Sequence, residues 1–302
     1  MKHIVIEIGT NSIKALSAEL GESGWDILSD KVYPTRIGAG LQVTQKISED
    51  ALKRNLDTVG LIISQFPDKA DTHFHLIATE SLRMAENAEV FMKQVKNLYG
   101  ISAEIISGDK EGELAYRGAT YPITNNEESV VVSDIGGGST EFTLGLGDDI
   151  RYIISLPIGA VKLTELCIKH DPATKNELND LNKFIDTQMA GLHKNKNVTR
   201  FIGVGGTVTT LALLSLNKPV SEVNQIEGKQ FTLEEVLRQT DYLAGLTIAE
   251  KNKLLNMPAG RADIIVAGSM ILSKAMINYG QTEFTVSTKG VRHGYLFSLI
   301  NP

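Results

Sequence analysis

A glycine-rich turn between two apolar strands is the stretch of this sequence best suited to chemistry. It joins a strand that ends near Asp134 to one that begins at Thr140. Consecutive glycines let a backbone approach a ligand closely, and their N–H groups can enclose a phosphate. A hard cation such as Mg²⁺ prefers carboxylate and phosphate oxygens. The pattern predicts phosphate binding by Gly136, Gly137, Gly138 and Ser139, with Mg²⁺ held by Asp134 and Glu141; a glycine-rich hairpin without a ligand is the alternative.

The N-terminal segment repeats this design. An apolar strand leads to a carboxylate, a short polar turn follows, and a second strand comes after it. A repeat this long is not a solenoid period, and it favours two related domains that face a shared cleft. Two unrelated hairpins of similar composition are the alternative. The corresponding residues lie 127 positions apart (134 − 7): Glu7 and Asp134, Gly9 and Gly136, and Ser12 and Ser139. The repeat therefore predicts a second phosphate turn, formed by Gly9, Thr10, Asn11 and Ser12.

A third glycine-rich turn, with Gly205, Gly206 and Thr207, follows a strand and opens a helix. The free N–H groups and the positive dipole end of a helix start suit an anion. Close packing of the strand against the helix would explain the same glycines. This turn therefore indicates anion binding only in combination with the other two glycine-rich turns.

Two charged residues near predicted helix starts could also take part. Glu111 could orient an attacking water as a general base, but its position alone favours the simpler role of complementing a helix dipole. Arg83 follows a strand end, where its guanidinium could bind phosphate oxygens or lie in solvent. His73 and His75 share one face of a strand, yet no third ligand is near in sequence, so we expect no metal there.

The elements that must position these residues alternate between strands and helices, which favours α/β layers. We expect helices over residues 48–66, 158–170, 175–194 and 260–279, and capping boxes at Thr232 and Thr247. A polar, turn-like segment lies near residue 125. The predicted domains are therefore residues 1–124, with the first phosphate turn and Glu111, and residues 125–302, with the second turn and the Gly-Gly-Thr turn.

Composition excludes several classes of protein. The 302 residues carry a net charge of −6, which argues against a broad basic surface for nucleic acid. The one cysteine, Cys167, excludes an internal disulfide and is expected in the core. No apolar run reaches the roughly 18 residues of a membrane span, and no signal peptide is recognisable. We therefore expect a cytoplasmic protein without a membrane or nucleic-acid partner.

Taken together, the motifs resemble the exopolyphosphatase / guanosine pentaphosphate phosphohydrolase (Ppx/GppA) family of the actin-like superfamily. The resemblance implies an α/β fold of two ribonuclease H-like domains around an interdomain cleft, and a Mg²⁺-dependent phosphoanhydride hydrolase that forms a homodimer. It adds Glu7 to the metal ligands and makes Glu111 the catalytic glutamate, which reverses the interpretation from position alone. The segments that carry it are residues 6–12, 36–41, 78–87, 104–112, 133–141, 205–211 and 260–263.

The resemblance implies an exopolyphosphatase that releases terminal phosphate from inorganic polyphosphate. Guanosine pentaphosphate 5′-phosphohydrolase activity and a sensor of phosphate chains or nucleotides with little turnover are the alternatives, and an actin-like filament protein is a more distant one. The chain departs from the family pattern at Glu7, Lys110 and Glu113, and at His293. Only four cations are candidates for gripping a polyanion in the cleft: Lys14, Arg36, Arg83 and Arg292.

Overall fold

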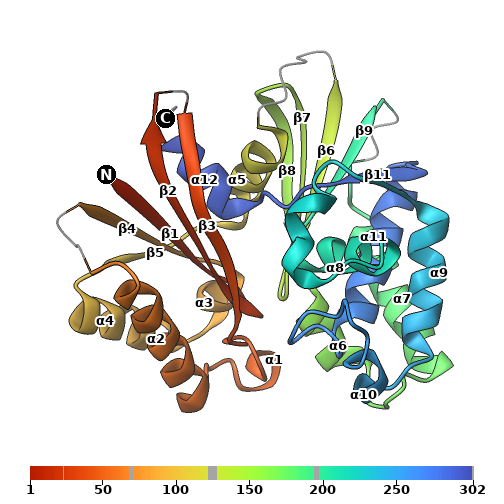
Figure 1. Cartoon of the computed structure of the whole chain (residues 1–302). Coiled ribbons are helices and arrows are strands. Elements are labelled where there is room, and N and C mark those ends of the chain that lie inside the picture. The colour runs from red at the N-terminus through yellow and green to blue at the C-terminus, as the bar shows by residue number, and fades with distance from the viewer. Residues whose placement is uncertain (23, 68–70, 122–127, 194–196, 301–302) are drawn as a thin grey trace.

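The computed structural model describes residues 1–22, 24–67, 71–121, 128–193 and 197–300, which form two sheets with helices packed on them (Figure 1). The first sheet has the strand order β3-β2-β1-β4-β5, and the second has the order β10-β11-β9-β6-β7-β8. The first sheet comprises β1 (Lys2–Ile8), β2 (Ser12–Gly21), β3 (Gly24–Pro34), β4 (Thr72–Ala78) and β5 (Ala103–Ile105). The second comprises β6 (Ser129–Ile135), β7 (Thr140–Leu146), β8 (Asp149–Leu156), β9 (Arg200–Val204), β10 (Gln230–Thr232) and β11 (Glu283–Val286).

The two sheets share one topology, which confirms the predicted two-domain α/β fold class. In each, three strands form an antiparallel meander, and the fourth pairs in parallel with the first. The two copies of the predicted repeat also have the same strand register. Glu7 pairs with Lys14 between β1 and β2, just as Asp134 pairs with Glu141 between β6 and β7. Both phosphate turns therefore leave their sheets at equivalent places.

Helices cover the outer faces of the sheets and fill the space between them. The helices of the first half are α1 (Leu41–Thr44), α2 (Glu49–Ser64), α3 (Glu80–Met84), α4 (Ala88–Tyr99) and α5 (Gly108–Thr120). Those of the second half are α6 (Ala160–Cys167), α7 (Lys175–Met189), α8 (Gly206–Ser215), η1 (Val220–Ile226), α9 (Leu233–Ala244), α10 (Ile248–Lys251), α11 (Ile265–Asn278) and α12 (Val291–Ser298). Among the described residues, no helix combines the length and hydrophobicity that crossing a membrane requires.

The helices α5 and α12 connect the two halves, between the sheets in Figure 1. The last helix, α12, packs on β1 and β2 of the first sheet, while α5 packs on β7 and β8 of the second. The pair crosses at glycines: a Cβ on Gly294 would collide with the Leu114 carbonyl, and one on Gly118 with the Gly290 carbonyl. This close crossing fixes the first turn of α5, where Glu111 lies, relative to both sheets.

Several predicted helix bounds need correction. The helix expected over residues 158–170 is the shorter α6, because Gly159 is extended and packs beneath the second phosphate turn. The helix expected from residue 260 begins at Ile265, since Gly260 has φ +73 and forms a turn. The capping boxes at Thr232 and Thr247 are confirmed, and Thr174 forms a third that was not predicted.

Two further expectations meet different outcomes. The helix expected over residues 175–194 ends at Met189. The domain boundary expected near residue 125 lies outside the described residues and stays a prediction. Cys167, expected in the core, is only partly buried at the end of α6, where it packs against the edge of the core cluster.

Candidate active site

The sheets meet at a cavity that all three glycine-rich turns line. It brings together most of the residues predicted from sequence, although they come from segments more than a hundred residues apart. Those that line it are Glu7, Gly9, Thr10, Asn11, Ser12, Glu111, Asp134, Gly136, Gly137, Gly138, Ser139, Gly205 and Gly206. Three predicted residues lie outside the lining: Arg83, Glu141 and Thr207.

The first two turns have the unpaired backbone donors that phosphate binding requires. Each turn is closed by one hydrogen bond, from the N–H of Gly9 to the Ser12 carbonyl and from the N–H of Gly136 to the Ser139 carbonyl, both at 3.0 Å. Within the described part of the chain, the remaining turn N–H groups find no acceptor; they belong to Thr10, Asn11, Gly137, Gly138 and Ser139. Two facing sets of free donors make a nest for an anion.

The third turn adds a helix N-terminus to the same cavity. Gly205 has φ +99, and a Cβ there would lie 2.7 Å from the Ile135 carbonyl oxygen and 3.0 Å from Asp134 Oδ1, so only glycine fits. This close approach places the start of α8 beside the Asp134 carboxylate. Thr207 points elsewhere: it is buried against Gly268 of α11 and does not line the cavity.

Arg261 is a cavity residue that the prediction missed. Its guanidinium lies against Gly206, where any Cβ would collide with it. The residue is 9% exposed, and its guanidinium has no hydrogen-bond or ion-pair partner among the described residues, although its backbone N–H donates to the Pro258 carbonyl. Burial, with the Arg36 charge, lowers its pKa to about 10, so it is still cationic at neutral pH. The sequence signal was the Gly260–Asp263 segment, which resembled the family without indicating a role.

Buried carboxylates concentrate negative charge in and behind the cavity. Burial raises the pKa of Glu111 to about 7; Arg83 opposes this rise, while Asp134 and Glu7 add to it. Burial also raises the pKa of Asp134 and, further, that of Glu141, which the Glu111 and Asp134 charges push in the same direction. A carboxylate with a pKa near neutrality is poised to exchange a proton with water.

Arg83 does not line the cavity itself but contacts it through Glu111. Its Nη1 donates to Glu111 Oε2 at 2.8 Å and to the Ile106 carbonyl at 2.7 Å, which ties α3 to the start of α5. Lys110 and Glu113, at which the chain departs from the family pattern, do not contact the Arg83–Glu111 pair. They bond to each other at 3.1 Å, and Arg117 joins Glu113 at 3.0 Å, on the outer face of α5.

The donor set fits a hard cation in part. Glu7 Oε2 and Glu141 Oε2 are buried oxygens without a hydrogen-bond partner, which is costly unless a cation or proton binds them. However, no three acidic, histidine or cysteine side chains of the described residues converge as a ready metal cage. Asp134 and Glu7 reach the cavity, whereas Glu141 accepts from Ser155 Oγ at 2.7 Å and does not line it. This suits Mg²⁺, which binds through one or two carboxylates together with substrate phosphates.

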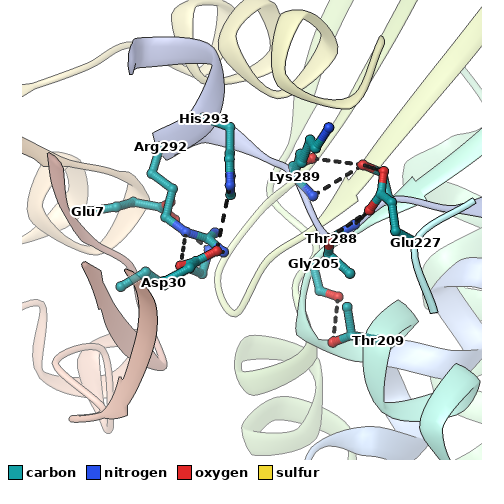
Figure 2. Close-up of polar contacts among 11 residues, drawn as sticks. Glu7, Asp30, Gly205, Thr209, Glu227, Thr288, Lys289, Arg292 and His293 are labelled. Carbon is teal, nitrogen blue, oxygen red and sulfur yellow. Dashed lines mark hydrogen bonds and ion pairs between the residues drawn. The ribbon is translucent and has the colours of Figure 1, made fainter. Parts of the chain in front are cut away.

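A second cavity shares Lys14, Asp134 and Arg261 with the first. On one side, Arg292 of α12 makes a two-pronged ion pair with Asp30 of β3, at 2.7 and 2.6 Å, and His293 lies beside it (Figure 2). On the other side, Glu227 accepts from the N–H and hydroxyl of Thr288 (Figure 2). The cavity's apolar wall comprises Val32, Val204, Leu213, Val220, Val223 and Pro258.

Each of the four predicted cleft cations already has an acidic partner. The distances range from 2.5 to 2.8 Å, so each positive charge is largely offset before a substrate arrives. The pairs are Lys14–Glu7, Arg36–Asp263, Arg83–Glu111 and Arg292–Asp30.

The histidines of β4, His73 and His75, lie apart from this site. The structure adds His3 to His73 and His75: the His3 and His75 rings stack at 5.3 Å, and His3 Nδ1 lies 3.1 Å from His75 Nε2. The rings make aromatic contacts between β1, β4 and Tyr295 of α12.

Comparisons with known proteins converge on one family. A family model described as the Ppx/GppA phosphatase family matches residues 17–301. Exopolyphosphatase 2 of Mycobacterium tuberculosis is 28% identical, over 97% of this chain and 97% of its own. A guanosine-5'-triphosphate,3'-diphosphate pyrophosphatase of Pseudoalteromonas translucida is 26% identical over 99% of this chain and 59% of its own. The crystal structure of the Aquifex aeolicus Ppx/GppA family member superposes with a TM-score of 0.84 and 31% identity, covering 100% and 98% of the two chains.

Proposed function

Because the chain belongs to the Ppx/GppA phosphatase family, we propose that it hydrolyses phosphoanhydrides and releases the terminal phosphate of inorganic polyphosphate. One observation carries the proposal: two turns with unpaired backbone N–H groups line the same cavity as Glu111. The full-length similarity to an exopolyphosphatase supports polyphosphate as the substrate. A homodimer, which the family resemblance implies, and a cytoplasmic location, which we expect from the sequence, are also part of the proposal.

The residues suggest how the reaction proceeds. The amides of Gly137 and Gly138 hold the oxygens of the terminal phosphoryl group, where charge spreads in the transition state. Glu111, kept in place by Arg83, accepts a proton from the attacking water. Asp134 and Glu7 would hold a Mg²⁺ ion, which supplies charge neutralisation at the phosphate oxygens.

The second cavity favours guanosine pentaphosphate as an additional candidate substrate. It adjoins the phosphate turns, and its apolar wall of valine, leucine and proline side chains suits a nucleoside better than a phosphate chain. Phosphate release from polyphosphate and from guanosine pentaphosphate, each with Mg²⁺ and with a chelator, tests both candidates. Release from neither substrate in the presence of Mg²⁺ would contradict the proposed activity.

Substituting Asp134 tests the metal assignment. We expect Asp134→Asn to raise the Mg²⁺ concentration that gives half-maximal activity, because a hard cation loses an anionic oxygen ligand. Titration of Mg²⁺ against phosphate release measures this midpoint. Asp149→Asn is the control, because this residue lies at the exposed start of β8. An unchanged midpoint in Asp134→Asn would remove the residue from the metal site.

The paired cations predict how long chains are processed. A polyphosphate chain offers only negative oxygens. Binding it far from the reacting end therefore requires lysine or arginine side chains that are not already paired with carboxylates. The four candidate cations are paired with carboxylates, and the chain as a whole is acidic. We therefore expect release of the substrate between cuts and better use of short chains.

Gel analysis of partly digested long polyphosphate measures this behaviour. Chains of intermediate length should accumulate during the reaction. Full-length chains beside free phosphate, with nothing between, would show that the enzyme holds its substrate and would contradict the expectation.

A further inference from the structure

Glu80 is an acidic side chain inside the cavity to which the proposed reaction assigns no role. It is the first residue of α3, is 6% exposed, and lines the cavity with the three glycine-rich turns. A buried negative charge beside a site for a polyanion opposes binding, because the two charges repel in a low dielectric. Its presence therefore requires a physical account.

The Glu80 carboxylate lies between the two phosphate turns. Its Oε2 accepts a hydrogen bond from Thr10 Oγ1 of the first turn at 3.4 Å. On the second turn it lies so close to Gly138 that any Cβ there would collide with it. The N–H of Gly138 has no acceptor among the described residues, so the carboxylate borders a backbone donor that is free for a phosphate oxygen.

No close cation compensates this carboxylate. Within the described residues Glu80 makes no ion pair; Lys162 of α6 and Arg83 act on it only from a distance, and Arg83 is bonded to Glu111. Burial raises the pKa of Glu80, and Lys162, Arg83 and the Thr10 hydroxyl oppose the rise. The other charged residues that line the cavity are Glu7, Lys14, Glu111, Asp134 and Arg261.

We infer that Glu80 controls phosphate affinity, because its carboxylate weakens phosphate binding at the second turn unless it takes up a proton from solvent. The inference rests on the proposed function in one respect, namely that the turns bind phosphate. A protonated carboxyl group can donate a hydrogen bond to a phosphate oxygen, whereas the carboxylate can only repel it. Phosphate binding is then coupled to proton uptake. When Glu80 is ionised, the product phosphate is bound weakly and can leave the site.

Calorimetric titration with inorganic phosphate tests the inference without turnover, because phosphate is the product. In the presence of Mg²⁺ at pH 8, Glu80→Gln should bind phosphate with a Kd about tenfold lower than that of the unmodified chain. Glu89→Gln is the matched control, since Glu89 is 83% exposed and pairs with Lys93 on the surface; the Kd of this variant for phosphate should stay within about twofold of that of the unmodified chain. In hydrolysis, Glu80→Gln should lower KM more than it changes kcat.

Repeating the titrations in buffers of different ionisation enthalpy counts the protons bound. The unmodified chain should take up more protons per phosphate than Glu80→Gln does, an effect that a merely structural role would not produce. Equal Kd and equal uptake in the two proteins would overturn the role of Glu80 alone. If Glu80→Gln folds poorly, the unmodified chain still decides: uptake no greater than that of phosphate itself would also overturn it. An unmodified chain that binds no phosphate would contradict the phosphate site and, with it, the proposed function.

Discussion

Glu111→Gln is expected to lower kcat by about 10²–10⁴-fold, the range for losing a general base. The amide keeps the shape of the side chain and can still accept from Arg83 Nη1, which lies 2.8 Å from Glu111 Oε2. It cannot accept a proton from water at neutral pH. The fold and the affinity for substrate should therefore persist while hydrolysis is lost.

Rates of phosphate release and calorimetric titration with tripolyphosphate separate these two effects. Glu113→Gln is the matched control, because Glu113 pairs with Lys110 and Arg117 on the outer face of the same helix. It should retain activity within a few-fold. A Glu111→Gln protein that turns over nearly as fast as the unmodified chain would show that another group activates the water.

Arg83→Gln is expected to reduce activity at pH 7 by about 10–100-fold, because an opposite charge beside a carboxylate lowers its pKa by roughly 1–3 units. The base works as the carboxylate, and with a Glu111 pKa of about 7 the rate of the unmodified chain should fall as pH drops through 7. Without the Arg83 cation, the pKa of Glu111 rises further. The acidic limb of the pH–rate profile then moves to higher pH, and raising the pH restores much of the lost rate.

The pH profile of kcat distinguishes this mechanism from general disruption. Arg83→Lys should restore part of the shift, because it keeps a cation but loses the rigid guanidinium whose Nη1 donates to both Glu111 Oε2 and the Ile106 carbonyl. Arg117→Gln, an arginine 42% exposed on α5, should leave the profile unchanged. A loss of rate in Arg83→Gln that is equal at every pH would contradict the tuning of Glu111 by Arg83.

Most residues that line the cavity could be predicted from sequence because the pattern that marks them is local. A strand, a carboxylate and a glycine turn lie within ten residues of each other, and the backbone conformation of the turn itself creates the free N–H groups. The repeat of this unit in Glu7 and Asp134 also predicted two equivalent sheets, since strand register follows from the hydrophobic pattern. Helix bounds were less predictable where a glycine with special packing, such as Gly159, interrupts an apolar pattern.

The charge partners of the site were decided only by the tertiary structure. Nothing in the sequence near Asp30 indicates Arg292, 262 residues later, and Arg261 and Glu80 gave no local signal of a buried position in the cavity. The same holds for Glu141, which lies next to Asp134 in register yet faces Ser155 instead of the cavity. By itself, the sequence determined which segments could bind phosphate, because backbone geometry is set within a few residues. Which charges meet there depended on how α5 and α12 cross between the sheets, and that crossing is set by packing between segments far apart in the chain.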